Sequence, residues 1–109
     1  MDIIQFNLSR SPGSYNHFLP LEIGDLTVSI QASSMHYCSP QMNFSSSDHY
    51  SEFEVAIFHG DDWFHPERDP RFADTSWAKY WSESDNVAGF VPREEVAQMI
   101  YDLNIAFSN

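Results

Sequence analysis

The feature that most limits how this chain can fold is the strict alternation of apolar and polar residues between positions 26 and 32. Successive side chains of a β-strand point to opposite faces of a sheet, so a period of two predicts a strand with one buried face. The residues expected on the buried face are Leu26, Val28, Ile30 and Ala32. Those expected to face solvent are Thr27, Ser29 and Gln31.

Three further strands are expected, at residues 4–8, 50–58 and 86–91. In the strand at 50–58 the core face is expected to hold Phe53, Val55 and Ile57. A long serine-rich connection precedes this strand, and antiparallel pairing with the strand at 26–32 is the simplest arrangement.

The chain between residues 59 and 76 is expected to be an irregular segment packed against the protein. Gly60, Pro66 and Pro70 interrupt any regular element there, while aromatic residues persist between them. A helical turn or a short strand is expected at residues 77–81.

An amphipathic helix is expected near the C-terminus, from Pro92 to about Asn104. Proline suits the first helical position, and the carboxylates of Glu94 and Glu95 favour the positive end of the helix dipole. Apolar residues then recur with the spacing of one helix face, at Val96, Met99, Ile100 and Leu103. The fold class expected is α+β: an antiparallel sheet of about four strands packed against this helix.

The length of 109 residues fits a single domain, residues 1–109, and a hydrophobic fraction of 42% excludes a disordered polyanion. No apolar run reaches the roughly 18 residues that a membrane-spanning helix needs. The first residues lack the basic and apolar regions of a secretory signal. The single cysteine, Cys38, excludes an intramolecular disulfide and favours a cytoplasmic location.

The chain carries 16 Asp and Glu against 5 Lys and Arg, a net charge of −11. Such a charge argues against direct binding of nucleic acid or of an anionic membrane, and favours a basic protein surface as the partner. Between residues 52 and 69 Arg68 is the only Lys or Arg. The acidic candidates for partner binding in this segment are Glu52, Glu54, Asp61, Asp62, Glu67 and Asp69.

Carboxylates at alternate positions of a strand can imitate the phosphates of a nucleic-acid backbone. The hypothesis is a small acidic protein that occupies a basic surface of a larger partner. A phage-encoded inhibitor of a host nucleic-acid-binding complex, of the anti-CRISPR or DNA-mimic type, is one such protein. Tryptophan is a frequent interface anchor, and Trp63, Trp77 and Trp81 are the aromatic candidates, with a place in the core as their alternative role.

A small metal-binding domain or enzyme is the alternative hypothesis, because two imidazoles and two carboxylates lie between residues 59 and 65. Their spacing matches no compact metal motif, so neither a metal nor a cofactor is expected. The weak candidates for ligands are His59, Asp61 and His65. An accessory protein whose acidity only keeps it soluble is a further alternative.

No catalytic residue is assigned. Cys38 and His36 are spaced to share one face of a strand, but no third group orients them as a nucleophile and base. Glu52 and Glu54 also share a face, and a solvated strand surface is the simpler interpretation of the pair. The sequence favours no particular oligomeric state.

Overall fold

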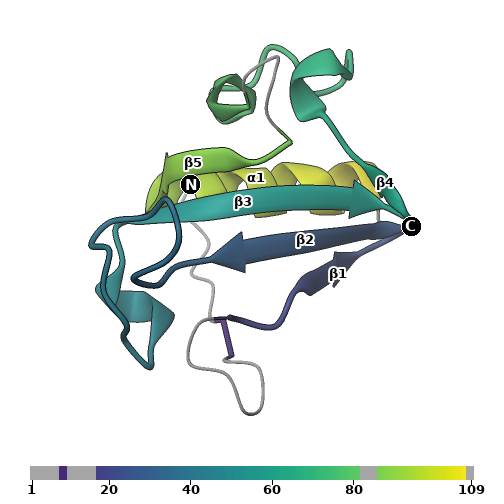
Figure 1. Cartoon of the computed structure of the whole chain (residues 1–109). Helices are drawn as coiled ribbons and strands as arrows, with labels where there is room; N and C mark the ends of the chain where they lie inside the picture. Colours follow the sequence, from purple (N-terminus) through teal and green to yellow (C-terminus); the bar gives the residue numbers. More distant parts are fainter. Residues whose placement is uncertain (1–7, 10–16, 82–85, 108–109) are drawn as a thin grey trace.

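The computed structural model describes residues 8–9, 17–81 and 86–107. These residues contain an antiparallel sheet of five strands and one long helix (Figure 1). The strands are β1 (Leu21–Ile23), β2 (Leu26–Gln31), β3 (Glu52–His59), β4 (Asp62–Trp63) and β5 (Ala88–Pro92). The helices are α1 (Arg93–Phe107) and three short 3₁₀ helices, η1 (Ser47–His49), η2 (Pro66–Arg68) and η3 (Ala78–Tyr80). The α+β class is confirmed.

β3 is the central strand of the sheet. It pairs with β2 on one side, and on the other side with β4 near its end and with β5 near its start. The register between β2 and β3 places Val28 opposite Ile57 and Ile30 opposite Val55. The antiparallel pairing expected across the long connection is therefore confirmed.

The core forms between one face of the sheet and α1. The alternate residues of β2 and β3 that were expected inside are all fully buried: Leu26, Val28, Ile30, Phe53, Val55 and Ile57. The helix contributes its own buried face of Val96, Ala97, Met99, Ile100 and Leu103. The period of two in the strands and the period of about 3.6 in the helix therefore both predict residues of the same core.

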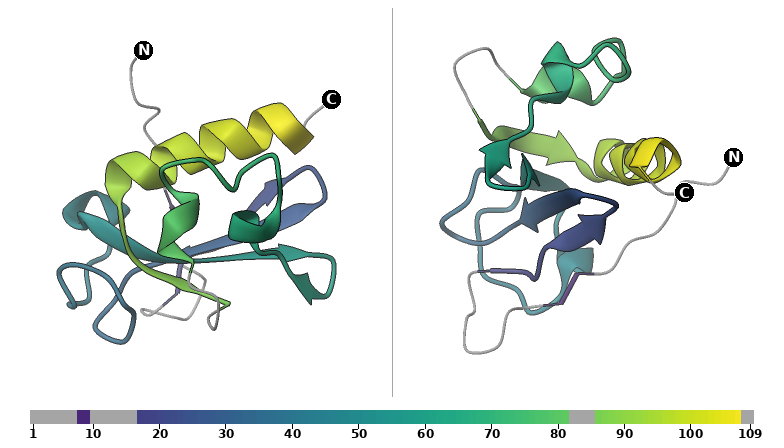
Figure 2. Two further views of the ribbon diagram at one scale, coloured as in Figure 1. Left: turned by 90° about the horizontal axis from the view of Figure 1, so that it is seen from above. Right: turned by 90° about the vertical axis from the view of Figure 1, so that its right-hand side faces the viewer.

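The other face of the sheet is less covered. Figure 2 shows α1 lying along one face, with η2 and η3 beyond the β5 edge. On the face turned away from α1, the side chains of Thr27, Glu54 and Phe58 are only half-buried. This half-buried face, which we call the outer face, is the open side of the sheet.

Gln31 lies opposite Glu54 on the outer face, as the alternation predicts, but it does not face solvent, because only 8% of the residue is exposed. Its amide makes two hydrogen bonds to the backbone of Phe18, accepting from the Phe18 N–H at 2.7 Å and donating to the Phe18 carbonyl at 2.9 Å. A polar side chain is stable in the interior when its donors and acceptors are paired. Gln31 thus holds the segment before β1 against the end of β2.

The helix differs from its expected limits at both ends. Pro92 is the last residue of β5 and pairs with Glu52, so α1 begins one residue later, at Arg93. The helix continues past Asn104 to Phe107. The Phe107 ring lies 6.2 Å from that of Phe72, and this tertiary contact stabilises the last turn.

Two short strands were not expected. β1 has three residues, and β4 has two within the segment interpreted as irregular. A tight turn joins β3 to β4, where Gly60 has the positive φ of +65° that glycine adopts at little cost. Residues 77–81 form the helical turn that was one of the two expectations. The strand expected at residues 4–8 lies outside the described residues except for Leu8, which is buried.

None of the described helices is both long enough and apolar enough to span a bilayer.

Candidate functional site

The structure divides the acidic residues between 52 and 69 among three places. Glu52 and Glu54 lie at the start of β3, whereas Asp61 and Asp62 lie beyond its end, in the turn to β4 and the first position of that strand. An eight-residue strand extends roughly 24 Å from end to end at about 3.4 Å per residue. The single acidic surface expected over this segment is therefore two separate ones at opposite ends of a strand.

The side chains of the other two acidic residues of the segment, Glu67 and Asp69, are mostly buried. Asp69 accepts hydrogen bonds from Arg71 Nε at 3.1 Å, Arg71 Nη2 at 2.8 Å and the Arg71 backbone N–H at 2.9 Å. The side-chain hydrogen bond to Arg71 lowers the pKa of Asp69 below its ordinary value. The side chain of Glu67 is 16% exposed, and the nearest cationic group is Arg68 Nε at 3.9 Å. Both carboxylates are therefore poorly placed to meet a partner.

Trp77 and Trp81 were expected to anchor a partner, and the structure places both in the core. They are 0% and 3% exposed, and their rings meet edge to face at a centroid distance of 6.1 Å. Trp63 is different, because 43% of it is exposed. Its ring lies 4.6 Å from that of Phe58 across the β3–β4 pairing. Of the three candidates, Trp63 alone remains accessible.

A pair of exposed aromatic residues lies near the other end of β3, and the sequence did not single it out. Tyr37 is 62% exposed and Phe90 is 43% exposed, with ring centroids 6.0 Å apart. Phe90 follows Gly89 in a β-bulge, where the pairing of β5 with β3 shifts between Phe53 and Val55. An extra residue in a strand turns a side chain out of the regular alternation. The one sequence signal was the glycine.

Backbone hydrogen bonds join this aromatic pair to Glu54. The Tyr37 N–H donates to Glu54 Oε2 at 2.9 Å, and the Phe90 N–H donates to the Tyr37 carbonyl at 2.9 Å. Both ion pairs between described residues involve Glu67 or Asp69, so Glu54 has no cation within the described chain. We call Tyr37, Glu54 and Phe90 the aromatic–acid cluster.

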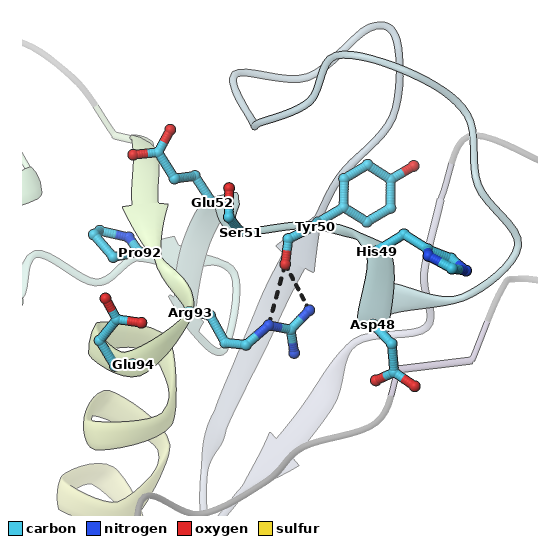
Figure 3. A pocket seen from close by; sticks show the side chains of 8 residues that line it. All are labelled: Asp48, His49, Tyr50, Ser51, Glu52, Pro92, Arg93 and Glu94. Atoms are coloured by element: carbon cyan, nitrogen blue, oxygen red, sulfur yellow. Dashed lines mark hydrogen bonds between the residues drawn. The ribbon is translucent and has the colours of Figure 1, made fainter.

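A pocket of about 470 Å³ opens nearby, between η1, the start of β3 and the start of α1. Figure 3 shows its lining residues, among which the carboxylates of Asp48, Glu52 and Glu94 do not meet at one point. Arg93 donates to the Tyr50 carbonyl from Nε at 3.1 Å and from Nη2 at 2.7 Å. Its guanidinium is therefore already paired inside the protein, and the pocket presents mainly negative charge.

The structure does not gather the residues proposed as metal ligands. His65 Nε2 lies 2.8 Å from Asn86 Oδ1, while His59 ends β3 and Asp61 follows in the turn. Among the described residues no three His, Cys, Asp or Glu side chains are grouped closely enough to hold a metal ion. The alternative of a metal site in residues 59–65 gains no support from this arrangement.

Cys38 is buried in the core and is bonded to the backbone. Only 1% of the residue is exposed, and its thiol donates to the Ser33 carbonyl at 3.1 Å. His36 Nδ1 lies 2.7 Å from the Ser33 hydroxyl. A buried thiol that is bonded to the backbone is inaccessible to a substrate and acts as a small core residue.

No family model, curated protein or solved structure matches this chain.

Proposed function

We propose that this protein is a small acidic binding protein that occupies a basic surface of a larger partner through its outer face. The observation that carries the proposal is the position of Glu54, a carboxylate beside two exposed aromatic rings with no neutralising cation in the described chain. Glu52 stands two residues away on the same face, above a pocket with two more carboxylates.

The chemistry of this face fits a protein partner. Exposed tyrosine and phenylalanine rings supply apolar contact area, and interfaces are enriched in such residues. Uncompensated negative charge, in a chain of net charge −11, attracts a basic surface and accelerates the encounter. A surface of both kinds suits binding better than catalysis, because the carboxylates do not converge on one point.

The partner that we favour is a protein whose basic groove normally holds nucleic acid. Glu52 and Glu54 lie about 6.5–7 Å apart along β3, so they present a short row of negative charges. A groove that binds phosphates accepts such a row, and the protein then acts as an inhibitor by occupying it. A phage-encoded inhibitor of the anti-CRISPR or DNA-mimic type belongs to this class.

The first test is an affinity purification of partners from host-cell lysate at low and at high salt, followed by mass spectrometry. We expect a specific partner to be a basic protein that is retained at low salt and lost at high salt. The Kd of the purified pair is then measured for the wild type and for the double variant Glu52→Gln/Glu54→Gln. We expect about tenfold weaker binding by the double variant, which is about 1.4 kcal/mol.

The matched control is Asp25→Asn/Asp74→Asn, which removes the same charge from two exposed positions outside the outer face. We expect its Kd to stay within about twofold of wild type. Equal weakening by the two double variants would mean that only the total charge matters. Binding that is insensitive to salt and to all four substitutions would contradict the proposal and favour acidity that serves solubility.

A further inference from the structure

The aromatic–acid cluster has the composition of a site for one particular side chain. We propose that Tyr37, Glu54 and Phe90 bind an arginine side chain on the basic surface of the partner. The guanidinium packs against the two rings and pairs with the Glu54 carboxylate. The inference rests on the proposed function and specifies which group of the partner is recognised.

The cluster is held in place before any partner arrives. Tyr37 lies in the loop between β2 and β3, Glu54 on β3 and Phe90 on β5, so three separate segments meet there. The hydrogen bond from the Tyr37 N–H to Glu54 and that from the Phe90 N–H to the Tyr37 carbonyl link all three. Groups that are already positioned lose little entropy on binding, so weak contacts contribute more to affinity.

The backbone of Phe90 is strained in a way that keeps its ring exposed. Its φ is +53°, a left-handed conformation that costs a bulky residue free energy and that glycine or asparagine adopts more readily. The ring gains little burial in return, because 43% of the residue remains exposed. Strained residues concentrate at binding sites, and here the strain presents a phenylalanine beside Tyr37.

The cluster favours a guanidinium over other groups. A cation is required because Glu54 is negative, and no cation of the described chain pairs with it. Between the two basic side chains, the guanidinium is planar and weakly hydrated, so it stacks on aromatic rings while donating to a carboxylate. Glu54 Oε2 already accepts from the Tyr37 N–H, which fixes the carboxylate while its second oxygen can receive a donor.

Binding of an arginine side chain to the aromatic–acid cluster is tested without a partner protein. ¹⁵N-labelled protein is titrated with N-acetyl-arginine amide at constant ionic strength. The controls are the same titrations with N-acetyl-citrulline amide, a neutral analogue of similar shape, and with N-acetyl-lysine amide. We expect arginine to shift the amide signals of Tyr37, Glu54 and Phe90, citrulline to leave them unchanged, and lysine to bind more weakly. Equal shifts with citrulline, or none with arginine, would overturn the proposal.

Three variants then separate a binding role from a structural one. Glu54→Gln keeps an acceptor for the Tyr37 N–H and removes the charge, Tyr37→Leu removes one ring, and Phe90→Asn removes the other while suiting the positive φ. We expect each to weaken arginine binding about two- to fivefold, as an exposed cation–π or ionic contact predicts. Phe90→Asn should do so without loss of thermal stability.

The control is Ile105→Ala, which removes an equally exposed apolar side chain from the end of α1 and should leave arginine binding unchanged. The same variants are measured against the partner. If Glu52→Gln/Glu54→Gln weakens the partner complex but Tyr37→Leu and Phe90→Asn do not, the arginine site is wrong and the acidic binding function stands. If the free protein binds arginine but no basic partner is retained at low salt, the proposed function fails instead.

Discussion

The indole Nε1 of Trp77 donates a hydrogen bond to Asp102 Oδ2 at 2.8 Å. This bond joins the fully buried tryptophan that precedes η3 to the third turn of α1. Asp102 Oδ1 also accepts from Gln98 Nε2 at 3.0 Å, so the carboxylate is fixed from two sides. The hydrogen bond therefore connects the segment before η3 to the one long helix of the described chain.

Replacing Asp102 with Ala should destabilise the protein by about 1–3 kcal/mol, because it leaves the buried indole N–H without an acceptor. The urea midpoint measures the change. Glu95→Ala is the matched control: Glu95 Oε1 accepts from the Ser76 hydroxyl at 2.9 Å, and this bond also joins α1 to the segment before η3 but is exposed. The control should cost about 0.5 kcal/mol or less. Equal losses would mean that burial of the indole N–H is unimportant.

Replacing Ile100 with Asp should destabilise the protein by at least about 3 kcal/mol, because Ile100 lies on the buried face of α1 at 8% exposure. Ile105→Asp places the same charge on the same helix where the side chain is 64% exposed, and should cost about 1 kcal/mol or less. Both are measured by chemical unfolding. A stable Ile100→Asp protein would contradict the packing of α1 on the sheet.

Replacing Gln31 with Leu should cost about 1–3 kcal/mol, because the backbone N–H and carbonyl of Phe18 lose their side-chain partners. The volume of the side chain is nearly conserved, so a loss reports on the hydrogen bonds rather than on packing. Thr27→Val, on the same strand but half-buried on the outer face, should be nearly neutral. Thermal unfolding distinguishes the two variants.

Long elements with a clear period could be predicted from the sequence. β2 and β3 follow a period of two and α1 a period close to 3.6, and in each case the expected apolar face is buried. β1 and β4 could not be predicted from the sequence, because strands of three and two residues are too short to show a period. The burial of Gln31 was missed for another reason: alternation predicts the face of the sheet, and the residue that covers this side chain, Phe18, lies 13 positions away in the chain.

The candidate site was harder to predict, because it depends on which residues lie close together in the fold and not on their separation along the chain. Asp61 and Glu54 are seven residues apart, but an extended strand separates them, whereas Glu54 and Tyr37 are 17 residues apart and directly bonded. For Trp77 and Trp81 the sequence left a partner interface and the core both open, and the structure buries both residues. Phe90 belongs to an apolar run that resembles a core strand, and only the bulge turns it outward.

Asp69 should make the stability of the folded protein depend on pH. The hydrogen bond from the Arg71 side chain lowers the pKa of Asp69 below its ordinary value of 3.8. A carboxyl group whose pKa is lower in the folded state contributes stability above its unfolded pKa, and this contribution is lost as the pH falls through the folded pKa. Because Arg71 is about half exposed, we expect the ion pair to contribute about 0.5–1 kcal/mol at neutral pH.

Asp69→Asn should therefore have a lower urea midpoint than the wild type at pH 7, and the two midpoints should converge as the pH falls well below 3.8. Asp74→Asn, an exposed carboxylate five residues away, is the matched control and should follow the wild type at both pH values. A difference between Asp69→Asn and the wild type that stays constant with pH would assign the effect to the shape of the turn. Only convergence at low pH identifies the charge of Asp69, held by Arg71, as the source of the stability.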